Sequence, residues 1–156
     1  MENKPITNIS VSYNIALVTV DSLPNNNNVI SGIFNSIAQQ KINIDMISQT
    51  PPYRGTISLS FSIPSEDLVK AIGALNALKK DVPSLRVEVD ADNTKVSIYG
   101  KEMNNLPGVA ARLFTTMAKN GIDVKLVTTS EVDISYLIYE KDVDRAINAI
   151  KKEFDV

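Results

Sequence analysis

The sequence predicts an α+β protein made of two ferredoxin-like βαββαβ units, and two observations support this fold class. First, the apolar pattern of one loop, helix and strand occurs twice, about 80 residues apart, which indicates a duplicated unit. The matched pairs are Val29 and Val109, Ile33 and Leu113, Phe34 and Phe114, Ala38 and Ala118, and Ile42 and Ile122. Second, segments with strand and helix periodicity follow one another in the order strand, helix, strand, strand, helix, strand.

The first unit is expected at residues 14–92. Its alternation is clearest over 56–63, where Ile57, Leu59 and Phe61 share one face and serines occupy the other. The expected elements are strands at 15–23, 42–47, 56–63 and 85–89, and helices at 29–38 and 68–78. This unit therefore contains every element of the βαββαβ order.

The second unit lacks its last strand. Its expected elements are strands at 96–100, 122–127 and 134–139, and helices at 109–118 and 143–150. Without a further strand, its sheet would keep an unpaired edge. The alternating segment 6–13 has no place in the first unit, so we expect it to complete the second. The second unit would then consist of residues 1–13 and 93–156, with the first unit inserted between them.

The composition is typical of a globular protein and argues against several classes of function. Of the 156 residues, 44% are hydrophobic and 22% are charged, and the net charge of −2 would not attract nucleic acid or an anionic membrane surface. Cysteine and histidine are absent, which removes thiolate metal ligands and the commonest general base. No apolar run reaches the roughly 20 residues of a membrane span. We therefore expect a cytoplasmic protein without a metal, a cofactor, a catalytic site, a nucleic-acid partner or a membrane partner.

Two other functions of this topology have little support in the sequence. Single-stranded RNA binders stack bases on exposed aromatic side chains, but aromatic residues make up only 6% of this chain and form no cluster with basic residues. A hydrolase of the acylphosphatase type would need an arginine within a phosphate-binding loop. Neither Arg54 nor Arg112 lies in such a loop.

Three motifs, in order and spacing, carry a resemblance to a known family. They are INIDMI at 42–47, LPGVAA at 106–111 and TSEVDIS at 129–135. With them, nearly the whole chain resembles the tandem ACT regulatory region of aspartate kinases. The resemblance implies a non-catalytic module, a homodimer paired through its sheets, and an aspartate kinase catalytic domain or subunit as a further partner. It also implies that lysine, threonine or both bind at ACT–ACT interfaces as feedback inhibitors of aspartate-family amino-acid biosynthesis.

An amino acid suits such a site physically, because its carboxylate can bind the unpaired N–H groups where a loop enters a helix. By resemblance, the first unit contributes Asn25, Asn28, Val29, Ile30, Asp45 and Gln49 to the effector site. The partner unit contributes Thr129, Ser130 and Glu131. The equivalent loop of the second unit contains Asn105, Pro107, Gly108, Val109 and Ala110.

One departure from the family pattern affects the first loop. Where the family usually has Asp-x-Pro-Gly, residues 25–28 are all asparagine, so Asn25 replaces the acid that would pair with the effector's ammonium group. This loop is either a weakened effector site, a site for a different effector, or a solvated loop ending in a helix cap. The alternative function is a stand-alone ACT module that dimerises but no longer binds an effector. The sequence also leaves open whether the chain is free-standing, a regulatory subunit or a fragment of a kinase.

Overall fold

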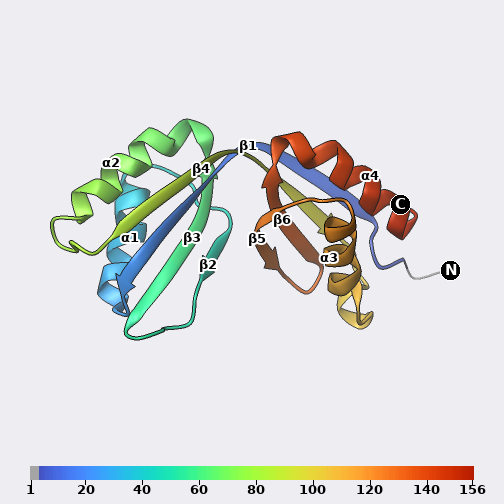
Figure 1. Ribbon diagram of the computed structural model, residues 1–156, viewed down its shortest axis with the longest axis horizontal. Helices are drawn as coiled ribbons and strands as arrows, with labels where there is room; N and C mark the ends of the chain where they lie inside the picture. The colour runs from blue at the N-terminus through green and yellow to red at the C-terminus, as the bar shows by residue number, and fades with distance from the viewer. Residues whose placement is uncertain (1–3) are drawn as a thin grey trace. The chain divides into compact units, whose positions relative to one another are not determined.

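The computed structural model describes residues 4–156, and these residues form two compact units (Figure 1). The first unit is Asn14–Asp92, and the second unit combines the N-terminal segment up to Tyr13 with Asn93–Val156. Residues 1–3 of the N-terminal segment assigned to the second unit lie outside the described residues. No helix among the described residues is long and apolar enough to cross a membrane.

The first unit is a sheet with two helices against one face (Figure 1). Its elements are the second half of β1 (Asn8–Pro24), α1 (Asn27–Gln39), β2 (Ile47–Gln49), β3 (Thr56–Pro64), α2 (Leu68–Leu78) and the first half of β4 (Arg86–Tyr99). The strand order is β2-β3-β1-β4, and β3 is antiparallel to both β1 and β2. Alternate residues of the strands point to the helices because the side-chain period of a strand is two. Val18 of β1 and Phe61 of β3 are therefore fully buried, and Ile33 of α1 packs in the same core.

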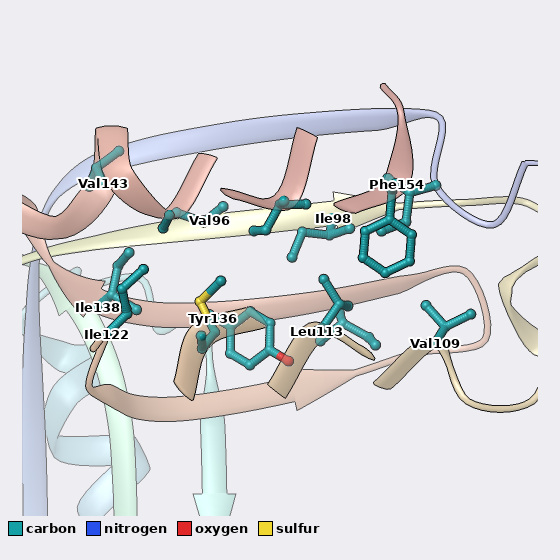
Figure 2. Close-up of a cluster of buried hydrophobic side chains, with 14 of the residues drawn as sticks. Val96, Ile98, Val109, Leu113, Ile122, Tyr136, Ile138, Val143 and Phe154 are labelled. Atoms are coloured by element: carbon teal, nitrogen blue, oxygen red, sulfur yellow. The ribbon is translucent and has the colours of Figure 1, made fainter. Parts of the chain in front are cut away.

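The second unit repeats this arrangement. It contains α3 (Val109–Lys119), β5 (Val124–Thr129), β6 (Asp133–Tyr139) and α4 (Val143–Phe154), together with the remaining halves of β1 and β4. Both β4 and β5 are antiparallel to β6. Figure 2 shows its core, in which Val96, Ile98 and Tyr136 of the sheet meet Leu113 of α3 and Phe154 of α4.

The N-terminal segment completes the sheet of the second unit, as the sequence predicts. The Thr7 N–H donates to the Tyr99 carbonyl over 2.8 Å, and Ile6 is fully buried in the core of this unit. Gly100 allows the close approach, because a Cβ atom there would lie 1.7 Å from the Pro5 carbonyl oxygen. The expected α+β fold of two ferredoxin-like units, the second completed by the N-terminal strand, is therefore confirmed.

Some strand boundaries differ from the prediction. The expected strands at 6–13 and 15–23 are one long strand, β1, and the expected strands at 85–89 and 96–100 are joined in β4. Asn14 and Asp92, beside the boundaries between the units, have positive φ angles of 58° and 60°. These two residue types tolerate the left-handed region better than other non-glycine residues. A polar residue with an irregular backbone angle thus interrupts the side-chain pattern but not the strand.

Two other expectations are wrong in detail. Residues 42–46 are not a strand, although Met46 is buried and its N–H donates to the Ser62 hydroxyl oxygen over 2.9 Å. Phe114, predicted to lie on the buried stripe of its helix, is 45% exposed. Its ring instead packs edge-on against Tyr136, with 5.4 Å between ring centroids.

Candidate functional site

The start of α3 has unpaired backbone donors. Gly108 is the N-cap residue, has a φ angle of 92° and has no side chain to cap the helix. The first intrahelical bond runs from the Arg112 N–H to the Gly108 carbonyl over 3.0 Å. The N–H groups of Val109, Ala110 and Ala111 therefore have no acceptor within the helix. Because the first turn also contains no acidic residue, the positive end of the helix dipole is not neutralised by its own sequence.

The turn between β5 and β6 lies next to this helix start. The Ser130 hydroxyl donates to Asp133 Oδ1 over 2.6 Å and accepts from the N–H groups of Val132 and Asp133, each over 3.2 Å. The Val132 carbonyl accepts from the Gly100 N–H over 2.8 Å, which attaches the turn to the end of β4. Ser130 therefore holds the turn in shape, and Glu131 is exposed beside it.

The helix start and the turn line an open cavity of about 330 Å³. Its lining consists of Met103, Asn104, Leu106, Pro107, Gly108, Val109, Ala110, Thr129, Ser130, Glu131 and Ile134. Met103, Val109 and Ile134 are buried and apolar, whereas Glu131 adds a carboxylate and α3 adds backbone donors. A cavity of this kind, with a few polar groups among apolar ones, is typical of a small-molecule site. It offers an anion site, a cation site and an apolar surface together, the combination that a free amino acid requires.

The start of α1 differs, although it occupies the corresponding place in the first unit. Asn26 is its N-cap residue, and its side-chain oxygen accepts from the Asn28 N–H over 2.8 Å. The Val29 and Ile30 N–H groups bond to the Asn26 carbonyl over 3.1 and 3.2 Å. The donors of these three residues are therefore used within the chain, so an effector carboxylate would have to compete with the cap. Asn25 N–H donates to the Gly55 carbonyl over 3.0 Å.

The remaining residues predicted for the first-unit site lie in several places. Asn28 and Val29 line a separate groove between α1 and α2, and Ile30 packs against the core of the first unit. Asp45 is exposed and precedes β2, and Gln49 ends β2, where it is paired with Leu59 of β3. Their grouping with residues 129–131 remains a prediction.

Within the second unit, residues 129–131 lie together with residues 107–110. Asn105 belongs to the short 3-10 helix Met103–Asn105, where its side-chain amide donates to Glu102 Oε2 over 3.1 Å, and it does not line the cavity. Four lining residues were not predicted: Met103, Asn104, Leu106 and Ile134. Leu106 and Ile134 had a sequence signal, because Leu106 opens the LPGVAA motif and Ile134 lies in the TSEVDIS motif.

Comparisons with known proteins agree with this fold. The family described as ACT domain matches residues 18–78 and again residues 96–154, which defines a tandem ACT protein. Aspartokinase from Bacillus sp. (strain MGA3) is 37% identical over 155 residues, and Aspartokinase 2 from Bacillus subtilis (strain 168) is 32% identical over 155 residues. Each match covers 99% of this chain but only 38% of the relative's length.

Two solved structures of regulatory subunits or subunit complexes are matched over nearly their full length. A crystal structure of aspartokinase alpha and beta subunits superposes with a TM-score of 0.89 and 31% identity, covering 97% of this chain and 99% of that one. The ligand-free regulatory subunit of aspartate kinase from Thermus thermophilus superposes with a TM-score of 0.88 and 25% identity, with the same coverage. This chain therefore belongs to the aspartokinase family and corresponds to its tandem ACT regulatory region.

Proposed function

We propose that this chain is a non-catalytic, cytoplasmic sensor that binds a free amino acid, lysine or threonine, and thereby gives feedback control of an aspartate kinase. The observation that carries the proposal is the cavity in which the unpaired start of α3 and the Glu131 carboxylate lie together. The similar structures of a regulatory subunit and of alpha and beta subunits support association with a catalytic subunit or domain. An ACT–ACT homodimer, which the family resemblance implies, would close the site at its interface.

The chemistry of the lining suggests how an amino acid would bind. Its carboxylate would accept from the N–H groups of Val109 and Ala110, and its ammonium group would pair with Glu131. Its side chain would lie against Met103 and Leu106. Threonine fits this lining better than lysine, because the lining offers no second carboxylate for the lysine side chain. The capped first-unit loop would be the weaker of the two sites.

A thermal-shift titration with single amino acids tests the proposal, because a ligand that binds only the folded state raises the melting temperature. We expect threonine to raise it, and Glu131→Gln to weaken binding by about one to two decades through the loss of a charge-assisted hydrogen bond. Glu140→Gln is the matched control, since Glu140 is an exposed acid of the same unit outside the cavity. Equal binding by the two variants would contradict the assignment of Glu131.

The alternative function is an ACT module that only dimerises. It would be favoured if no amino acid shifted the melting temperature at millimolar concentration while light scattering still showed a stable dimer. The absence of both binding and dimerisation would refute both functions.

A further inference from the structure

Gly100 lies between the N-terminal segment and the cavity at the start of α3. On one side, the Pro5 carbonyl oxygen stands only 1.7 Å from where a Cβ atom of Gly100 would be. On the other side, the Gly100 N–H donates to the Val132 carbonyl over 2.8 Å, and the Gly100 carbonyl accepts from the Met103 N–H over 3.0 Å. Met103 lines the cavity, and Val132 belongs to the turn that contributes residues 129–131 to it. Gly100 therefore connects the segment to two parts of the cavity lining.

The contacts of residues 4–7 with the second unit centre on one buried side chain. Ile6 is fully buried, the Thr7 N–H donates to the Tyr99 carbonyl over 2.8 Å, and Lys4 Nζ donates to the Asp155 carbonyl over 2.8 Å. Lys4 and Thr7 are themselves exposed. A short segment held in this way can open locally while the rest of the unit stays folded.

Such an opening would change the surroundings of Gly100. Gly100 is buried and has no side chain, so the Pro5 carbonyl is the group that packs against its Cα atom. When residues 4–7 leave, Gly100 regains the backbone freedom of an uncovered glycine. Its hydrogen bonds to Val132 and Met103 then lose their fixed geometry.

The turn between β5 and β6 would pass this change to the cavity. The Ser130 hydroxyl accepts from the Val132 N–H over 3.2 Å, so the residue that Gly100 holds is bonded to a residue of the lining. Glu131 lies between these two residues in the chain and contributes its carboxylate to the lining. The position of this carboxylate therefore depends on whether the segment is docked.

We infer that residues 4–7 act as a latch on the amino-acid site: docking of the segment orders the lining around Gly100, so docking and ligand binding favour each other. The inference rests on the proposed function, because it concerns the regulation of the same cavity. By linkage, a bound amino acid holds the latch closed, and a partner that pulls the latch away weakens binding by the same factor. Occupancy of the cavity is thereby transmitted to the N-terminal segment.

Hydrogen exchange of the full chain, measured by NMR with and without saturating threonine, tests the coupling directly. Bound threonine should slow exchange of the Thr7 N–H by about fivefold or more, the usual range of allosteric coupling, although Thr7 does not line the cavity. The control is the Asp81 N–H, which donates to the Leu78 carbonyl over 3.1 Å in the first unit. Its exchange rate should not change.

A pair of variants tests the latch without a ligand. Ile6→Asp would bury a carboxylate and should therefore undock the segment, whereas Asn8→Asp adds the same charge at an exposed position two residues away. In Ile6→Asp, the Gly100 and Met103 N–H groups should exchange about tenfold faster or more, and the amide resonances of residues 130–132 should shift. Asn8→Asp should resemble the parent in both measurements.

The variants also allow the two directions of the coupling to be compared. Threonine affinity should fall in Ile6→Asp by at least the factor measured at the Thr7 N–H, and it should be unchanged in Asn8→Asp. The Ile122 N–H, which donates to the Met117 carbonyl over 3.0 Å, reports whether the second unit stays folded. If it loses its protection in Ile6→Asp, Ile6→Ala takes the place of that variant, with smaller changes in the same direction.

The possible outcomes separate the latch from the proposed function. Unchanged exchange at Gly100 and Met103 in a variant whose Thr7 N–H exchanges freely would overturn the latch. Bound threonine that leaves Thr7 exchange unaltered would overturn it as well. If no amino acid binds while the lining still loosens in Ile6→Asp, the proposed function fails, but the control of the cavity by residues 4–7 is supported.

Discussion

Gly100 lies directly under the backbone of the N-terminal segment, and Gly100→Ala should displace that segment from the second unit. The added Cβ atom would stand 1.7 Å from the Pro5 carbonyl oxygen, 2.8 Å from the Pro5 carbonyl carbon and 3.2 Å from the Ile6 Cα. All three are backbone atoms, so no side-chain rotation relieves the overlap. The segment has to move away from β4.

The size of the effect follows from what the movement would expose. Ile6 is fully buried, and burial of an isoleucine side chain is worth about 1.5–3 kcal/mol. The Thr7–Tyr99 hydrogen bond adds about 0.5–1.5 kcal/mol. Gly100→Ala should therefore lower the free energy of unfolding by about 2–4.5 kcal/mol, measured by urea denaturation followed by circular dichroism.

The control is Gly73→Ala, an exposed position inside α2 where a Cβ atom meets nothing within 4 Å. This change should raise stability by about 0.5–1 kcal/mol, because alanine favours a helix interior. In a chain lacking residues 1–7, Gly100→Ala should have almost no further effect, since the atoms it strikes are gone. The reasoning fails if the free energy of unfolding of the full-length Gly100→Ala variant lies within about 0.5 kcal/mol of the value for the parent.

Further predictions concern other parts of the chain. Tyr136→Phe should raise stability by about 1–2 kcal/mol, because the buried Tyr136 hydroxyl finds no hydrogen-bond partner among the described residues. Burial also raises the pKa of Tyr136 to about 12. Between its unfolded value of 10.0 and about 12, the unfolded state loses this proton while the folded state keeps it, so stability should fall as pH rises. Tyr136→Phe should remove that component of the pH dependence, and an unchanged slope in urea titrations would contradict it. Deletion of residues 1–13 should expose a sheet edge and cause aggregation or loss of cooperative melting, and light scattering of the intact chain should show a dimer at micromolar concentration. Asn25→Asp should tighten amino-acid binding at the first-unit loop by about one to two decades, and Gln49→Ala should abolish it there; calorimetry that found neither variant different from the parent would remove both residues from the site.

The fold was predictable because its signals are local and repeated. Apolar periodicity identified the helices. Because the second unit had no strand after its last helix, a segment from elsewhere in the chain was expected to complete its sheet. The continuity of β1 and β4 was not predictable, because Asn14 and Asp92 interrupt the side-chain pattern while the extended backbone continues through both strands. The exposure of Phe114 also depends on tertiary packing, since helix periodicity alone places it near the buried stripe.

The site was predictable in part. The Pro107-Gly108 motif and residues 129–131 do line one cavity, but the sequence resemblance assigned them to different sites. Whether the backbone N–H groups at a helix start are free to bind a ligand depends on whether an asparagine side chain caps them by a hydrogen bond. Asn26 does so in the first unit, while Gly108 has no side chain that could do so in the second. Four consecutive asparagines give no indication of which one forms the cap.

The place of the N-terminal segment has a consequence for the order of synthesis. On the ribosome, residues 6–13 emerge roughly 80 residues before the strand with which they pair, which is a delay of roughly 4–16 s at usual elongation rates. During that time the first unit, whose residues are contiguous, has everything it needs to fold. The waiting segment carries Thr7, Ser10 and Ser12 between its apolar positions, and these exposed polar residues lower the tendency of an unpaired strand to aggregate. A released chain that ends at residue 92 should therefore hold a folded first unit preceded by an open, soluble strand.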